Sequence, residues 1–477
     1  FLEGRDTGEE GYRLAAYFGA ILFQAAGLQP MFNDASGAPS YFQPIAFEST
    51  AVSGASTMRA SVGGRTRSYR LVEEFLALQV AAAGNLETDQ TPVFLGYGIE
   101  EPDHGWNDYE GMNVSGKIAI IVPGAPERNG QPVLPAEQHE VYSSLARSAN
   151  ARVMSALNHD VAALIVVVDS GSSALWNEAN AMMSQPSVRP AEPSGSEEAG
   201  PRSAPWIIVV RAHDAVDLLS GSGYHPVSET GPCTPGILDG VSIALDLRRE
   251  TEPAFSASNV VALLPGTDSI LKDEYIVVTA HLDHVGIRGG QIYNGADDNA
   301  SGSAAVLEAA EAAAMAPTRR SIIFVLLTAE EKGLLGARHF ADHPPVPIDD
   351  IVLNINLDMV GRNSPDWPES LLAMGSENRR PELLELIRDV NARVGATLDW
   401  RLNEGSDPYV HVQRSDQLAF MQKGIPAILI TRGFMGPDYH QPSDDPETIN
   451  YAKVLQAARL AYALAVEAGN RDPLFRD

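Results

Sequence analysis

The sequence predicts an α/β domain with a mixed, mainly parallel sheet that carries helices on both faces, together with a β-rich domain inserted into it. Three observations support this fold class. The chain has 477 residues, which exceeds one compact core and suggests about two or three domains. After about Ser256, apolar strand-like runs alternate with Ala-rich helical segments. Between about Ser53 and Glu250, short β-like runs separated by turn residues prevail instead.

Residues 41–47 are expected to form a strand, and five more are expected after Ser256, where five short apolar runs are each bounded by polar or turn residues. These runs are residues 259–264, 275–279, 321–327, 352–357 and 427–431. Helical spacing of apolar residues predicts helices at residues 9–27, 301–316, 334–342, 381–394 and 451–468. Strands that are apolar along their whole length and alternate with helices favour a parallel sheet covered on both faces.

The middle of the chain has a different texture. Its apolar runs are short, and they lie at residues 93–97, 117–122, 162–168 and 206–210. We therefore place the α/β domain at residues 1–54 and 246–477, and the inserted domain at residues 55–245.

Composition and charge restrict the partners of this chain. Acidic residues outnumber basic ones by 62 to 34, which gives a formal net charge of −28. Such a surface repels a phosphate backbone, so we do not expect nucleic acid as a partner. No apolar run approaches the roughly 20 residues that a membrane-spanning helix needs, so no membrane span is expected. The sequence leaves the oligomeric state open.

The start of the sequence suggests an exported protein. It begins at Phe1 rather than at an initiator Met, in the middle of the motif Phe-Leu-Glu-Gly-Arg. We expect that an upstream signal peptide has been removed and that the protein is secreted or periplasmic. The single cysteine, Cys233, allows no intrachain disulfide.

Acidic and histidine side chains follow the ends of four predicted strands, and one acidic pair precedes a predicted helix. They are His281, Asp283 and His284; Glu330 and Glu331; Asp358; His440; and the pair Asp297 and Asp298. The carboxyl ends of parallel strands meet at one edge of a sheet, where ligand sites form, so one cleft can collect them all.

This collection of side chains predicts a metal site. A single Asp at a helix start is usually a cap, and a single His is usually a satisfied neutral side chain. Several carboxylates in one cleft repel one another unless a cation compensates them. Imidazoles with carboxylates suit zinc, and a catalytic zinc keeps a position open for water, which favours hydrolysis. We interpret Asp298 as a structural or helix-capping residue rather than as a ligand, and His284 as a surface or packing residue rather than as a sixth ligand.

These motifs resemble those of peptidase family M28, a family of two-zinc peptidases with a zinc-exopeptidase fold. The matching segments are Ala280-His-Leu-Asp283, Gly295-Ala-Asp-Asp-Asn-Ala-Ser-Gly302, Ala329-Glu-Glu331, Asn356-Leu-Asp358 and Tyr439-His440. The inserted region, with Gly96-Tyr-Gly-Ile99 and Gly116-Lys-Ile-Ala-Ile-Ile121, is similar to the protease-associated domain found in many members. The resemblance therefore implies a metallo-aminopeptidase that binds two Zn²⁺ ions and acts on peptides with a free N-terminus.

The resemblance also implies a role for each matching residue. One zinc ion would be held by His281 and Asp358, and the other by Glu331 and His440. Asp297 would bridge the two ions, and a cis peptide would follow it.

Three further residues would act in catalysis. Glu330 would be the general base. Asp283 would orient the His281 ring from outside the coordination sphere. Tyr439 would donate a hydrogen bond to the oxyanion.

Other functions remain open at this stage. A carboxypeptidase or dipeptidase of the same family needs a basic group for a free carboxylate, and Arg288, Arg362, Arg414 and Arg432 could supply one. From another class, the chain could be a peptide-binding protein on an inactive peptidase scaffold. Loss of the base or of a ligand would indicate this, and no such loss is visible.

Overall fold

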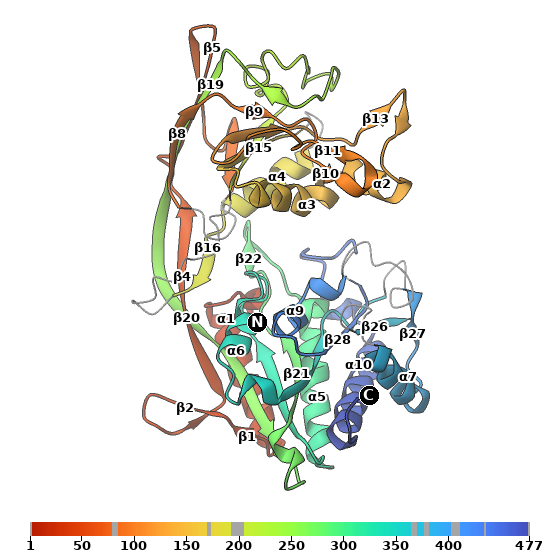
Figure 1. The fold of residues 1–477 in the computed structure, drawn as a ribbon. Helices are drawn as coiled ribbons and strands as arrows, with labels where there is room; N and C mark the ends of the chain where they lie inside the picture. The colour runs from red at the N-terminus through yellow and green to blue at the C-terminus, as the bar shows by residue number, and fades with distance from the viewer. Residues whose placement is uncertain are drawn as a thin grey trace. The chain divides into compact units, whose positions relative to one another are not determined.

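The computed structural model describes two compact units, one formed by Phe1–Phe47 with Phe255–Asp477 and the other by Glu48–Ala254. Within these limits it describes residues 2–78, 84–168, 173–191, 205–363, 370–375, 381–401, 411–433 and 436–475. Figure 1 follows the chain through both units.

The first unit is built on one large sheet. Along the sheet, its main strands follow the order β4-β20-β24-β21-β25-β28-β26-β27. Their bounds are β4 Phe42–Val52, β20 Arg249–Leu264, β24 Ser321–Leu327, β21 Tyr275–His281, β25 Ile351–Leu357, β28 Ala427–Thr431, β26 Leu371–Gly375 and β27 Leu398–Asp399. The short strand β1 (Gln29–Pro30) adds to β20 in the antiparallel sense.

Four neighbouring strands at the centre of this sheet are parallel. β21 pairs in parallel with β24 and with β25, and β25 pairs in parallel with β28. β20 and β26 flank this group in the antiparallel sense. The central strands are apolar and buried on both faces, as parallel strands between helical layers must be. The predicted mixed, mainly parallel sheet is confirmed, and the strand expected at residues 41–47 is β4. The strands β26 and β27 were not revealed by the sequence pattern.

Helices cover both faces of this sheet. On one face, α6 (Leu335–Asp342) and α9 (Gln417–Gln422) bury Phe340 and Phe420 against β24. On the other lie α1 (Glu10–Ala25) and the Ala-rich α5 (Gly302–Ala314). On this second face Phe23 of α1 lies 6.5 Å from Phe324 of β24.

Two more helices complete the second face. α10 (Tyr451–Asn470) packs along α5, and α7 (Pro381–Val394) packs on α10. Each of the five predicted helices is therefore present, with its ends shifted by a few residues at most.

The described part of the second unit contains two larger sheets besides two short two-stranded ones. The larger has the order β18-β9-β12-β15-β17-β7, and β9, β12, β15 and β17 run parallel in it. The smaller is antiparallel, with the order β6-β5-β19-β8. The strand bounds are β5 Thr57–Val62, β6 Arg65–Tyr69, β7 Phe75–Leu78, β8 Leu86–Gln90, β9 Val93–Phe94, β12 Ile118–Ile121, β15 Ala163–Val168, β17 Trp206–Arg211, β18 Gly236–Ile237 and β19 Val241–Leu247. The helices are α2 Ala136–Ser143, α3 Leu145–Asn158 and α4 Ser173–Met183.

The unit boundaries differ from the predicted domain boundaries. They fall at 47/48 and 254/255, whereas the sequence suggested 54/55 and 245/246. The reason is that β4 and β20 are long strands that run through these positions without a turn or a change in composition. The assignment of the second unit to the protease-associated class stays a prediction.

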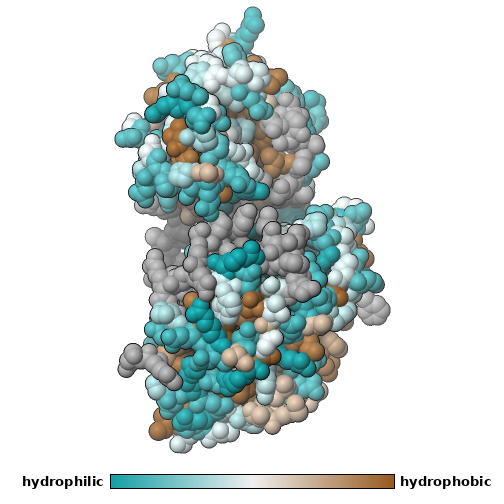
Figure 2. Space-filling view, turned by 90° about the vertical axis from the view of Figure 1, so that its right-hand side faces the viewer, coloured by the Kyte–Doolittle hydropathy of each residue, from teal (hydrophilic) through white to brown (hydrophobic). Residues whose placement is uncertain are grey.

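The exterior agrees with the acidic composition. On the face that Figure 2 displays, hydrophilic side chains predominate and hydrophobic ones are interspersed among them. Within the described part of the chain, none of the helices combines the length and the apolar character that crossing a membrane requires.

Candidate metal centre

Neighbouring parallel strands of the first unit deliver the candidate ligands to one edge of the sheet. β21 ends at His281, and Asp283 and His284 follow it directly. β24 leads into the loop that carries Glu330 and Glu331. β25 leads into Asp358. The sheet alone therefore brings together residues that are far apart in the sequence.

The side chains form two adjoining clusters. His281, Glu330 and Asp358 make up the first cluster, and His281 Nε2 lies 3.3 Å from Asp358 Oδ1. The second cluster consists of His284, Asp298, Glu331 and His440. In the second cluster His440 Nε2 lies 3.1 Å from Glu331 Oε2.

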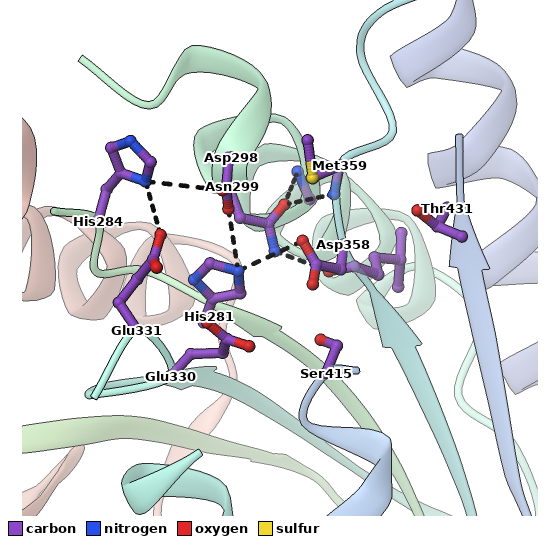
Figure 3. A network of polar contacts seen from close by, with 12 residues as sticks. His281, His284, Asp298, Asn299, Glu330, Glu331, Asp358, Met359, Ser415 and Thr431 are labelled. Atoms are coloured by element: carbon purple, nitrogen blue, oxygen red, sulfur yellow. Dashed lines mark hydrogen bonds and ion pairs between the residues drawn. The ribbon is translucent and has the colours of Figure 1, made fainter. Parts of the chain in front are cut away.

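Asp298 joins the two clusters. Its Oδ1 lies 3.4 Å from Nε2 of His281 in the first cluster, and its Oδ2 lies 3.2 Å from Nε2 of His440 in the second. Figure 3 shows Asp298 between His281 and His284, with Glu330 and Glu331 on the neighbouring loop. A carboxylate in this place is the one that could bridge two metal ions.

The prediction that Asp297 is the bridging residue is therefore corrected by one position. Asp297 Oδ2 accepts a hydrogen bond from Arg432 Nε at 2.7 Å, and its Oδ1 accepts one from the Gly361 N–H at 2.6 Å. The cis peptide also lies one residue later than expected, between Asp298 and Asn299. Two adjacent carboxylates in one tight turn point in different directions, and the sequence pattern does not distinguish them.

Asp283 has a different role from the predicted one. Its carboxylate oxygens accept hydrogen bonds from the backbone N–H groups of Glu330 and Glu331, at 3.1 and 3.2 Å. The His281 ring instead faces the backbone carbonyl of Asp283, with Nδ1 at 3.1 Å, while the Asp283 carboxylate is 3.9 Å away. Asp283 therefore orients His281 through its carbonyl group and positions the loop of Glu330 through its side chain.

Two residues of the N-terminal segment hold the same loops in place by hydrogen bonds. Arg5 is buried, and its guanidinium donates to the carbonyl oxygens of Leu282, Asn294 and Gly295 at 2.7–2.9 Å. Thr7 Oγ1 lies 3.2 Å from Asp283 Oδ2. Arg5 therefore contacts the loops of the site, although more than 270 residues separate it from Leu282 in the sequence.

The electrostatics of the clusters show how strongly they attract positive charge. Burial lowers the pKa of His440, but Glu331 and Asp298 outweigh it and raise this pKa to about 10. Burial likewise opposes a charged His281, yet Glu330 and Asp358 raise its pKa well above the ordinary value. The carboxylates thus favour positive charge at this place, and a divalent cation would neutralise the same negative charge.

The donor set fits zinc. The clusters offer imidazole nitrogens and carboxylate oxygens only, which are typical zinc ligands. The donor atoms of each cluster lie within 4.8 Å of one another, so one ion could contact them together. Tyr439 lies beside them, because its ring stacks on His440 with 3.9 Å between the ring centroids.

The arginines considered for a carboxylate-binding site are partly engaged elsewhere. Arg432 is paired with Asp297, as described above. Arg362 lies 2.6 Å from Asp438 and 3.5 Å from Asp444. Neither of these two guanidinium groups is therefore available for a substrate carboxylate without breaking an ion pair.

Comparison with known proteins now identifies this arrangement. Residues 259–465 match the model of peptidase family M28. Within this segment the chain is therefore similar to peptidases of family M28. The segment contains both clusters, from His281 to His440.

Curated M28 relatives share this segment. The aminopeptidase YwaD of Bacillus subtilis is 30% identical over 212 residues, which are 43% of this chain and 43% of that protein. A probable leucine aminopeptidase of Trichophyton verrucosum is 24% identical over 54% of this chain and 68% of its own length. The match thus spans less than half of YwaD.

Solved structures extend the similarity to the whole fold. The aminopeptidase from Aneurinibacillus sp. strain AM-1 superimposes with a TM-score of 0.58, over 98% of this chain and 92% of the other, at 18% identity. BSAP, a zinc aminopeptidase from Bacillus subtilis, covers the same shares with a TM-score of 0.53 at 18% identity. At this identity the likeness concerns the fold, and it includes the inserted unit.

Proposed function

We propose that this protein is a zinc-dependent exopeptidase that removes the N-terminal residue from peptides. The observation that carries the proposal is the shared carboxylate of Asp298 between two clusters of zinc-type ligands at the carboxyl edge of the sheet. The names of the M28 relatives, which are aminopeptidases, support the choice of reaction.

Five residues would hold two zinc ions. His281 and Asp358 would bind one ion, Glu331 and His440 the other, and Asp298 both. When bound, the two ions would polarise the scissile carbonyl and lower the pKa of an attacking water. The hydrogen bonds of the Arg5 guanidinium and of the Asp283 carboxylate would keep the loops that carry the zinc ligands in place.

Glu330 would serve as the general base. It belongs to the His281 cluster, where it would take a proton from the attacking water and deliver it to the leaving amine. Burial raises the pKa of Glu330 well above its ordinary value, His281 opposes this effect, and Glu331 adds to it. The stacked phenol of Tyr439 would be the oxyanion donor.

An aminopeptidase fits the charges better than a carboxypeptidase or a dipeptidase with a carboxylate-binding site. The centre is rich in carboxylates, which attract the ammonium group of a free N-terminus. Arg362 and Arg432 are paired with Asp residues. A binding protein on an inactive scaffold would need no intact base, yet Glu330 is in place. A secreted or periplasmic location stays a prediction.

The test is hydrolysis of amino-acid p-nitroanilides with free and with blocked amino groups, each with and without a chelator. We expect release from the free amines only, and its loss with chelator. Release from blocked substrates at the same rate, or no release at all, would contradict the proposal and favour a carboxypeptidase or a binding protein.

A further inference from the structure

His284 is a buried imidazole that the implied set of zinc ligands leaves out. Its side chain is 0% exposed. Its Nδ1 lies 2.8 Å from Glu331 Oε1 and 3.8 Å from Asp298 Oδ2. Figure 3 shows one ring nitrogen of His284 directed at Glu331 and Asp298. Of the two interpretations that the sequence left open, a surface residue or a packing residue, the first is therefore wrong.

The distances in this cluster suit four ligands on one ion. Donor atoms on a tetrahedral zinc with bonds of about 2.0–2.2 Å lie roughly 3.3–3.6 Å apart. The two distances from His284 are 2.8 and 3.8 Å. Those from His440 Nε2 to Asp298 and Glu331 are 3.2 and 3.1 Å. The donor atoms of the four residues thus surround one position, and small shifts of these atoms would give the spacing of a tetrahedral zinc site.

The surroundings of His284 hold its ring in this orientation. A Cβ atom on Gly295 would lie 2.4 Å from Cγ of His284, so the ring needs a glycine at that position. The His284 N–H donates to the carbonyl oxygen of Arg5 at 3.2 Å, and Arg5 in turn donates to the Gly295 carbonyl. Nε2 of His284 has no hydrogen-bond partner among the described residues. The polar contacts of the ring therefore all lie on its Nδ1 side, toward the cluster.

We propose that His284 Nδ1 is a further protein ligand of the zinc held by Asp298, Glu331 and His440; this rests on the proposed function. That ion would then have four protein ligands. His281, Asp358 and Asp298 would hold the other ion, and Glu330 belongs to the same cluster as His281 and Asp358.

X-ray absorption at the zinc edge of the full chain, loaded with two zinc ions, tests this directly. Imidazole ligands give a characteristic scattering pattern, so their number per zinc can be measured. We expect three imidazoles for two zinc ions in the wild type, and two in His284→Asn. Two imidazoles in the wild type, or an unchanged count in the variant, would overturn the proposal.

The Asn variant separates a ligand from a hydrogen-bond donor. Asn places an N–H where Nδ1 of His stands, so it can still donate to Glu331, but its amide is a poor zinc ligand. Loss of a residue that only orients a ligand costs about 10–100-fold in metal affinity. In a chelator competition we expect that His284→Asn and His284→Ala each lower the affinity for one of the two zinc ions by more than about 100-fold. Full affinity in the Asn variant would show that His284 acts only as a donor.

Two controls complete the experiment. His343→Ala removes an exposed imidazole that stacks on His339 outside both clusters, and it should change neither the imidazole count nor the affinity. His440→Ala should also lower the count by one. If the wild type binds no zinc, the proposed function fails as well. If it binds two zinc ions and cleaves free-amine substrates while its imidazole count is two, only the role of His284 fails.

Discussion

The two units bury charged groups in opposite ways. In the unit around Glu48–Ala254, the buried Arg152 donates from its two terminal nitrogens to four backbone carbonyl oxygens, those of Tyr97, Val122, Gly124 and Tyr142. The buried Asp108 accepts from the Ile99 N–H and from Trp106 Nε1. Each buried charge in these two cases has its own local partners.

In the first unit, carboxylates converge instead of being separated. Asp298, Glu330, Glu331 and Asp358 lie in adjoining clusters around three imidazoles. Such a group is stable only if positive charge enters it, because like charges in a poorly hydrated place repel one another. The comparison teaches that burial of a charge alone does not indicate function. A functional site is indicated when several buried charges of the same sign lie together and have too few partners of opposite charge nearby.

The inserted unit also has a hollow, but of another kind. It is an apolar cavity of about 160 Å³ beside α3, lined among others by Leu145, Val166 and Val209, with Arg152 as its charged member. Because the terminal nitrogens of Arg152 already donate to carbonyl oxygens, this cavity offers little polar chemistry. The predictions below test whether the two units differ in this way.

The largest expected effect is that of Glu330→Gln. Loss of a general base lowers kcat by about 10²–10⁴-fold, while the ligands of both clusters remain. The measurement is kcat on a free-amine p-nitroanilide, together with the zinc content by mass spectrometry. Asp108→Asn in the other unit is the control and should leave kcat unchanged. Near-normal turnover of Glu330→Gln would remove this residue from the mechanism.

The next effect distinguishes the two adjacent carboxylates. Asp298→Asn removes the shared ligand, so zinc affinity should fall by more than the roughly 100-fold typical of residues outside the coordination sphere. Asp297→Asn should still bind two zinc ions. It leaves the buried Arg432 without its partner, which lowers the free energy of unfolding by about 3–5 kcal/mol.

Equilibrium dialysis and thermal unfolding of both variants provide the readout. If Asp297→Asn lost zinc and Asp298→Asn kept it, the bridging role would return to Asp297.

A smaller effect is expected from Arg152→Met. This change leaves four buried carbonyl oxygens without their donor, and each unsatisfied group costs about 1–3 kcal/mol before water or relaxation compensates it. We expect a net loss of about 2–4 kcal/mol in the unfolding free energy of the inserted unit. Denaturant unfolding, followed by hydrogen exchange in β12 and β15, measures it. If kcat fell at a temperature where the variant is folded, catalysis in the first unit would depend on Arg152 in the inserted unit, which contradicts the prediction.

The smallest effect is a pH dependence of stability in the inserted unit. Burial raises the pKa of Asp108 to about 6, against hydrogen bonds that lower it, whereas the unfolded value is about 3.9. Between these values the folded state binds more protons than the unfolded state, so stability falls as the pH rises from about 4 to about 6. The loss is at most about 3 kcal/mol.

The measurement is the denaturant midpoint of this unit at several pH values, for the wild type and for Asp108→Asn. The variant has no titrating group at this position, so the difference between the two proteins should change across this range. A difference that is constant with pH would contradict the raised pKa.

The sequence by itself determined most of the α/β unit. Long apolar runs such as 321–327 and 427–431 became β24 and β28 without a change in bounds, since strands buried on both faces have an unmistakable pattern. It also determined which residue types meet at the edge of the sheet, since His281, Glu331 and Asp358 each follow a parallel strand. The last two strands in the order, β26 (Leu371–Gly375) and the two-residue β27 at the edge, were missed.

Only the tertiary structure decided which of two adjacent carboxylates enters the site and where the His284 ring points. Both outcomes depend on contacts from distant parts of the chain. Arg432 draws Asp297 away from the clusters, and Gly295 together with Arg5 holds His284 within them. A local pattern records residue types and spacing. It carries no information on partners that arrive from more than 100 residues away, and those partners fix the direction of each side chain.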